Sequence, residues 1–237
     1  MENFDYIIVG GGSAASVLAE RLSQDGTANL IVLEAGPPDS NPYIQIPAGF
    51  IKTLFDPKVT WQFSSEPSEG TAGRRIQITQ GKTLGGSSAV NGGVYNRGQR
   101  LDFDSWAQKG NRGWGYDDVL PYFRRTERRV GPGDDLYRGR EGSLPITTPE
   151  WPSPLCDAFL ESAGLCGFPL NPDYNGATQE GVGRYQAAIL NGRRHSAAKA
   201  FLHPAARRKN VTVRTRAQIT RVLLADGTVS MRVVEKH

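Results

Sequence analysis

The first 34 residues constrain the fold more than any other part of the chain. Phe4–Val9 is a short apolar, β-branched run typical of a buried parallel strand. It leads directly into Gly10–Ala15, which has the spacing G-x-G-x-x-A, and apolar residues then recur at helical spacing until Asp25-Gly26. A second apolar strand, Asn29–Leu33, follows. Strand, glycine turn, helix and strand in this order predict a dinucleotide-binding element.

Each position of the glycine turn has a physical role beside a pyrophosphate. Gly10 permits a tight turn, Gly12 lets the backbone approach the phosphates, and Ala15 is small enough for the contact between helix and strand. The helix N-terminus offers free N–H groups and the positive end of its dipole. Glu34 lies about 20 residues beyond the glycines, where a carboxylate can accept both hydroxyls of an adenosine ribose and disfavours a 2′-phosphate. The candidate cofactor contacts here are Gly10, Gly12, Ser13, Ala14, Ala15, Glu34 and Ala35.

A second glycine-rich run, Gly81–Gly98, reads GKTLGGSSAVNGGVYNRG. Such a run has little apolar surface to bury, but it lets backbone N–H groups crowd against a large polar ligand. Taken alone, it is equally the composition of a flexible loop. Periodicity does not separate FAD from NAD as the ligand.

The two elements together closely resemble the first signature of the glucose–methanol–choline (GMC) flavin oxidoreductases. The resemblance runs from about Phe4 to about Val234, which is nearly the whole chain. Further motifs of the family are matched in the right order at Trp106–Phe123, at Asn175-Gly176 with Gln179 and Gly181, at Gly192–Ser196, and at Ala200–Leu202.

The resemblance implies an α/β fold, namely a doubly wound FAD/NAD(P)-binding domain that is Rossmann-like and of the glutathione-reductase type. An incomplete antiparallel-sheet substrate domain is expected to be interleaved with it. The expected boundaries are 1–150 for the first part of the FAD-binding domain, 151–195 for the start of the substrate domain, and 196–237 for the return to the FAD-binding domain.

The resemblance also implies a tightly held FAD. Some family members tether the flavin through a His at the position of Val90, so the FAD of this chain is expected to be non-covalent. Ile219 matches a residue whose backbone meets the adenine. The flavin contacts expected by match are Leu84, Gly85, Gly86, Ser87, Asn91, Gly92, Gly93 and Val94.

The activity that the resemblance implies is oxidation of the CH–OH group of a small-molecule alcohol, with hydride passing to flavin N5 and a C-terminal His taking the proton. The second family signature, ending in Ser-Gly-Ile-Gly, is absent from the sequence. His195 and His203 are expected to be surface or capping residues, and His237 is terminal. The chain is therefore expected to be an N-terminal part that lacks the C-terminal half, with no catalytic residue assigned and little turnover of its own.

Other function classes stay open from the sequence. The chain could be a non-catalytic flavin-binding module or one subunit of a split enzyme whose partner supplies the base. An NAD-dependent dehydrogenase is supported only by the opening element and leaves the second glycine run unexplained. The identity of the alcohol and of the electron acceptor is not readable from the residues.

Composition excludes several partners. The net charge is +4, but the arginines between 124 and 140 lack the interleaved aromatics of a nucleic-acid groove and are expected to form a solvated surface. No apolar run approaches the ~20 residues that span a bilayer, and no basic-then-apolar leader precedes the first strand, which favours a cytoplasmic protein. Cys156 and Cys166 show no metal or redox spacing and are expected to be reduced, partly buried thiols.

The remaining segments are expected to be less regular. Residues 37–75 are proline-rich and predict an irregular loop or lid, and residues 129–148 predict a long surface connection. Strands are expected at 211–215, 219–224 and 228–234. Asp226-Gly227 is a tight-hairpin signal between the last two.

Overall fold

The computed structural model describes residues 2–151, 153–225 and 228–235. The chain divides into two compact units, which are residues 1–93 with 191–237 (unit 1) and residues 94–190 (unit 2). The expected domain boundaries after 150 and 195 stay a prediction, because compact units need not coincide with the cofactor and substrate domains. Unit 1 closes at Gly93 and resumes at Asn191 because the intervening segment folds around a polar network of its own.

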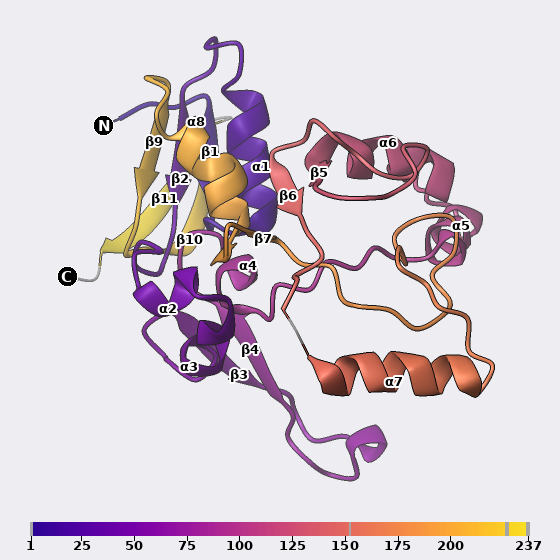
Figure 1. Cartoon of the computed structure of the whole chain (residues 1–237). Coiled ribbons are helices and arrows are strands. Elements are labelled where there is room, and N and C mark those ends of the chain that lie inside the picture. The colour runs from indigo at the N-terminus through magenta and orange to yellow at the C-terminus, as the bar shows by residue number, and fades with distance from the viewer. Residues whose placement is uncertain (1, 152, 226–227, 236–237) are drawn as a thin grey trace. The chain divides into compact units, whose positions relative to one another are not determined.

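Unit 1 is built on a three-stranded parallel sheet with the strand order β1-β2-β9 (Figure 1). β1 is Tyr6–Val9, β2 is Leu30–Leu33 and β9 is Val211–Arg214. Helix α1, Ser13–Leu22, makes the connection from β1 to β2. Parallel neighbours need such a crossover, so the opening element folds as its pattern predicts.

Both faces of this sheet are covered. All four residues of β2 are buried, and their side chains alternate between two hydrophobic clusters. Leu30 and Val32 join the cluster that contains residues of α1, whereas Ile31 and Leu33 pack with Ala217 on the other face. This layering confirms the expected doubly wound α/β class.

The other elements of unit 1 are short. The segment 37–75 is more regular than expected, because it contains two short α-helices, two 3-10 helices and a strand that pairs antiparallel with the strand ending at Gly81. The bounds are α2 Pro42–Gln45, η1 Pro47–Gly49, α3 Phe50–Thr53, β3 Thr60–Ser64, η2 Glu69–Thr71, β4 Gln77–Gly81, α4 Ser87–Val90, β8 Arg193–Arg194, η3 Ala198–Leu202 and α8 His203–Ala205.

The C-terminal strands form a separate antiparallel pair. β10, Ala217–Ala225, pairs with β11, Thr228–Glu235, and Ala225 lies opposite Thr228. With β9, the three strands expected in this region are confirmed. The turn at Asp226-Gly227 lies outside the described residues.

Unit 2 contains three helices and short strands. The bounds are α5 Arg100–Gln108, α6 Tyr116–Thr126, β5 Glu127–Arg129, β6 Leu144–Ile146, α7 Pro154–Leu165 and β7 Ile189–Leu190. Helix α7 buries none of its residues, and both Cys156 and Cys166 are exposed, so the expected partial burial of these thiols is wrong. In the parts of the chain that the structure describes, no helix combines the length and apolarity needed to cross a membrane.

The interior of unit 2 holds a buried ion cluster. The side chain of Glu127 is fully buried and accepts hydrogen bonds from both Arg97 and Arg138. Arg138, 1% exposed, also pairs with Asp173. The expectation that the arginines of this region form a solvated surface is therefore wrong for Arg138 and for Arg129, which is 5% exposed, because buried partners satisfy them.

Candidate cofactor site

A cavity of about 470 Å³ lies in unit 1 at the carboxyl ends of β1 and β2, and we call it the glycine pocket. Ligands of open parallel sheets bind at this edge, where the loops after the strands converge. The predicted contacts that line the cavity are Gly10, Gly12, Ser13, Ala14, Ala15, Glu34, Ala35, Gly86 and Ile219.

The first turn of α1 borders the glycine pocket without a capping side chain. Gly10 adopts a φ of +86°, which favours glycine, and its N–H donates to the Leu33 carbonyl at 2.8 Å. Gly12 is the N-cap residue, and in the described chain no side chain caps this helix or adds an acidic group to its first turn. The free N–H groups and the positive end of the helix dipole therefore suit an anion such as a pyrophosphate.

Glu34 lies beside this turn and is only 5% exposed. Its Oε2 accepts from the Gly11 N–H at 2.6 Å and its Oε1 accepts from the Gly36 N–H at 2.8 Å. Burial raises the pKa of Glu34, although the two backbone donors act in the opposite direction. Each carboxylate oxygen keeps a second acceptor site, so hydroxyl donors in the pocket would stabilise the charged form.

The second glycine run meets the first one backbone to backbone. Gly85 N–H donates to the Gly11 carbonyl at 2.7 Å. A Cβ placed on Gly86 would lie 2.8 Å from the Gly12 Cα, and a Cβ on Gly81 would lie 2.1 Å from the Gly86 carbonyl carbon. Two segments about 70 residues apart in the sequence thus form one wall, and only glycines allow this approach.

The other predicted flavin contacts do not line this cavity. Leu84 is a core residue that packs with the cluster around α1, and Gly85 lies against Ala198. The Ser87 hydroxyl accepts from the Gly81 N–H at 3.0 Å and donates to the Gln80 amide oxygen at 2.9 Å. The remaining predicted contacts, Asn91, Gly92, Gly93 and Val94, continue the chain from α4 to the start of unit 2.

Several residues of the pocket were not predicted. Trp61 of β3 lines it, and the Lys82 ammonium lies 4.4 Å from the centre of that indole ring. Nothing in the sequence around Trp61 indicates this place. Ala217 and Gln218 also line the pocket. They directly precede the predicted contact Ile219, and this position in the sequence could have indicated them.

The histidines differ in their surroundings. Nε2 of His203 lies 3.0 Å from Oδ1 of Asp39, a carboxylate whose side chain is 8% exposed, so this histidine is an ion-pair partner. His195 is partly buried, and His237 lies outside the described residues. Among the residues that the structure covers, no group of three or more His, Cys, Asp or Glu side chains could hold a metal ion.

The His203–Asp39 pair predicts a pH-dependent contribution to stability. The hydrogen bond that His203 donates to the Asp39 carboxylate raises the pKa of His203 above 6.5, against the opposing effect of burial. The stabilisation is therefore fully present below pH 6.5 and is lost as the pH rises through the higher folded-state pKa. We expect the difference in melting temperature between wild type and His203→Gln to shrink between pH 6 and pH 9. A difference that stays constant over this range would contradict the assignment.

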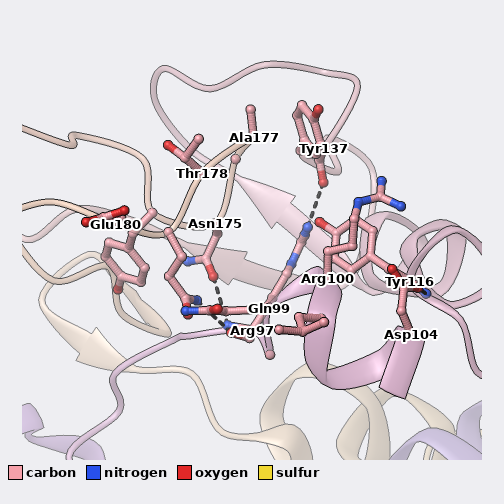
Figure 2. A pocket seen from close by; sticks show the side chains of 15 residues that line it. Arg97, Gln99, Arg100, Asp104, Tyr116, Tyr137, Asn175, Ala177, Thr178 and Glu180 are labelled. Carbon is pink, nitrogen blue, oxygen red and sulfur yellow. Dashed lines mark hydrogen bonds between the residues drawn. The ribbon is translucent and has the colours of Figure 1, made fainter. Parts of the chain in front are cut away.

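A second cavity, of about 620 Å³, lies within unit 2 (Figure 2). Arg97 lines it: its backbone N–H donates to the Asn175 side-chain oxygen at 2.8 Å, and its Nη1 donates to the Tyr137 carbonyl at 2.6 Å. Gln179 donates to the Arg97 carbonyl at 2.8 Å, and both terminal nitrogens of Arg100 bind Asp117. The Asn-Gly and Gln motif thus holds the loop at 175–180, and both guanidinium groups in the wall are already paired.

Comparison with known proteins places this geometry in one family. The family model for GMC oxidoreductases matches residues 4–235. The oxygen-dependent choline dehydrogenase of Brucella ovis is 48% identical over 207 residues, which are 87% of this chain and 38% of that protein. The chain therefore spans well under half the length of this curated relative.

Solved structures agree with the fold. A pyridoxine 4-oxidase from Mesorbium loti superposes with a TM-score of 0.91 at 37% identity, over 99% of this chain and 46% of its own. An FAD-dependent oxidoreductase from Chaetomium thermophilum superposes with a TM-score of 0.85 at 26% identity, over 99% of this chain and 44% of its own. With its glycine pocket, its doubly covered sheet and a family match over nearly its whole length, the chain belongs to the GMC oxidoreductases.

Proposed function

We propose that this chain is the FAD-binding part of an oxidoreductase that acts on the CH–OH group of a small alcohol. The observation that carries the proposal is the glycine pocket, in which an uncapped helix N-terminus, a buried carboxylate and two touching glycine segments converge. Family membership selects FAD among the dinucleotides that such a pocket suits.

The residues of the pocket fit the adenosine diphosphate half of FAD. The N–H groups of Ser13–Ala15 would hold the pyrophosphate, and Glu34 would accept the ribose hydroxyls with its free acceptor sites. Ile219 and Ala35 would border the adenine, and Gly86 leaves room for the phosphates beside Gly12. Contacts of the flavin ring with Asn91–Val94 stay a prediction from the resemblance.

The bound flavin would supply the redox step by taking a hydride, which is two electrons and one proton, from the carbinol carbon. The hydroxyl proton must leave to a base as the alcohol becomes an aldehyde or ketone, so atoms and electrons balance. We assign no residue of this chain as that base, because His203 is held by Asp39. That the base belongs to a C-terminal part and that the chain alone turns over little stay predictions, as does the cytoplasmic location.

We also propose that the FAD is held non-covalently. Val90 occupies the position at which some relatives carry a tethering His, and a valine side chain has no nucleophilic atom. It is 2% exposed and packs with Ile44, Val59 and Ala89. Its role in this chain is therefore apolar packing of the end of α4 against Ile44 and Val59.

An absorbance spectrum of the purified chain, before and after acid precipitation, tests both proposals. We expect flavin bands that move to the supernatant, where the released chromophore is identified as FAD. Flavin that stays with the precipitate would contradict the non-covalent linkage. A folded chain that is colourless and takes up no added FAD would contradict the proposed function.

Replacement of Glu34 tests the ribose contact. A hydrogen bond to a charged group contributes about 1.5–3 kcal/mol, so Glu34→Gln should weaken binding of ADP by about tenfold to hundredfold. Titration calorimetry with ADP and with 2′,3′-dideoxy-ADP would measure the coupling between Glu34 and the ribose hydroxyls. Wild type should bind the dideoxy nucleotide more weakly than ADP, whereas Glu34→Gln should bind the two nucleotides almost equally.

Glu66→Gln is the matched control for this cycle, because Glu66 is an exposed carboxylate of the same unit, paired with Arg75. It should bind both nucleotides as wild type does. Equal losses for the two nucleotides in wild type and in Glu34→Gln would show that Glu34 does not accept the ribose hydroxyls.

A nicotinamide dinucleotide would use the same contacts with α1 and Glu34, so it is the alternative ligand to exclude. Thermal unfolding with saturating NAD or FAD separates the two, because a ligand raises the melting temperature only through the folded state that binds it. We expect a larger rise in melting temperature with FAD than with NAD, because this pocket would hold NAD only through its ADP half, and an equal or larger rise with NAD would favour the nicotinamide dinucleotide. The alternative of a non-catalytic flavin module is tested in a protein as long as the curated relatives. Such a protein would support this alternative if it bound flavin but no alcohol reduced the flavin.

A further inference from the structure

Arg194 of β8 is a deeply buried cation with an unusual set of partners. The residue is 3% exposed, and its Nε donates to the Ile44 carbonyl at 3.0 Å. Its terminal nitrogens donate to the carbonyls of Ser88, at 3.2 Å, and Asn91, at 2.5 Å, and to the Asn91 side-chain oxygen at 3.0 Å. Within the described residues no carboxylate pairs with it.

Two other deeply buried arginines, Arg97 and Arg138, are neutralised by a carboxylate, whereas Arg129, which is 5% exposed, is held like Arg194 by uncharged acceptors. Arg97 and Arg138 both pair with the buried Glu127, whereas all acceptors of Arg194 in the described part of the chain are backbone carbonyl or side-chain amide oxygens. Burial lowers the pKa of Arg194, but a guanidinium stays protonated in proteins. A buried cation without a counter-ion is costly, and Arg194 differs from Arg129 in what it holds, because its acceptors include both oxygens of Asn91, a residue expected beside the flavin.

The guanidinium lies directly beneath the turn Asn91–Gly93. The Asn91 Oδ1 that it binds also accepts from the Gly93 N–H at 2.9 Å, and Gly93 has a φ of +74°. A Cβ on Gly93 would lie 3.5 Å from Nη1 of Arg194. Asn91 and Gly92 are exposed. Arg194 therefore contacts the buried side of the turn, and the other side of the turn faces solvent.

We propose that Arg194 is a positioning residue for the flavin. Its guanidinium holds the Asn91–Gly93 turn in place, and its unpaired charge favours the electron-rich, reduced form of a flavin bound beside that turn. The inference rests on the proposed function, since it takes Asn91–Gly93 as flavin contacts. The two halves, a clamp and a charge, have separate readouts.

The clamp is tested on the ligand-free chain by hydrogen exchange in Arg194→Met, Arg194→Lys and Arg193→Met. Arg193 is the matched control, because it is the neighbouring arginine and its side chain is exposed. The amides of Asn91, bonded to the Ser87 carbonyl, and of Gly93 should exchange at least tenfold faster in Arg194→Met and as in wild type in Arg193→Met. Unchanged exchange in Arg194→Met would overturn the clamp.

The charge is tested by the midpoint potential of FAD bound to the same variants, measured against a reference dye. Loss of the cation in Arg194→Met should lower the ratio of affinities for reduced and oxidised FAD by tenfold or more, a drop of about 30 mV for a two-electron couple. Arg194→Lys keeps the positive charge but loses the planar set of guanidinium donors. Its midpoint potential should therefore be close to that of wild type, whereas its amide exchange at Asn91 should stay fast. If Arg194 acted only structurally, the potential of Arg194→Met would equal that of wild type. That result would overturn the proposed effect of its charge on the flavin.

Small-molecule rescue separates charge from hydrogen bonding in a third variant, Arg194→Ala. Guanidinium at low millimolar concentration should restore the potential, whereas urea, which has a similar planar shape but no charge, should restore only slow exchange. Equal rescue of the potential by both would overturn the role of charge. A wild-type chain that binds no FAD would refute the proposed function instead, and the exchange experiment would still decide the clamp.

Discussion

Gly86→Ala is expected to abolish measurable FAD binding and to lower the stability of unit 1. The added Cβ would lie 2.8 Å from the Gly12 Cα, and Gly86 has φ +53° and ψ −137°, a conformation that L residues rarely adopt. Overpacking costs about 1–3 kcal/mol and such backbone strain about 1–3 kcal/mol. The overlap is with backbone, so relief requires the two glycine segments to separate, which opens the wall of the pocket.

Flavin fluorescence titration measures the loss of binding, and circular dichroism measures the melting temperature. Gly70→Ala is the control, because a Cβ there meets only the Ser68 hydroxyl oxygen at 4.0 Å in the same unit. It should bind FAD and melt as wild type does. Wild-type affinity and melting temperature in Gly86→Ala would show that the contact between the two glycine segments is not required.

Glu127→Gln is expected to unfold unit 2 at a much lower denaturant concentration. The substitution keeps the shape of the side chain but removes the negative charge that Arg97 and Arg138 share. Removing one partner of a buried ion pair leaves uncompensated buried charge and costs about 3–5 kcal/mol. Asp173, which is partly exposed, also pairs with Arg138 and would compensate for only part of this loss.

Tryptophan fluorescence follows this unit, since Trp106, Trp114 and Trp151 lie in it and only Trp61 lies in unit 1. Asp117→Asn is the control, because it removes a carboxylate from the exposed pair with Arg100 and should change the midpoint little. An unchanged unfolding midpoint for Glu127→Gln would mean that the cluster does not support the unit.

Local patterns predicted the opening element and the strands of the C-terminal region well. The alternation of β2, the glycine turn and the helical spacing of α1 each depend on residues within one or two turns of one another. The same reasoning was wrong for Arg138, since a run of arginines, glycines and aspartates has the composition of a surface loop. Its burial depends on Glu127 and Asp173, which lie 11 and 35 residues away.

Sequence spacing locates some residues of the candidate site but not others. The turn at Gly10–Ala15 and Glu34 follow from spacing alone, whereas the position of Trp61 follows from the pairing of β3 with β4, for which the sequence carries no clear signal. The side chain of Leu84 packs in the core around α1, so the flavin contact expected of Leu84, which stays a prediction, would have to come from its backbone. A motif identifies a segment, but the direction of each side chain depends on how that segment packs.

The sequence by itself determined the strand–turn–helix–strand element, the acid at its end and the family, because these depend on short-range periodicity and on residue types that few other folds require. Only the tertiary structure decided that Gly86 lies against Gly12, that both oxygens of Glu34 bind backbone N–H groups, and that Arg194 is buried without a carboxylate. These contacts join residues tens to more than a hundred positions apart. Their selection depends on burial and close packing over the whole unit, which no local pattern encodes.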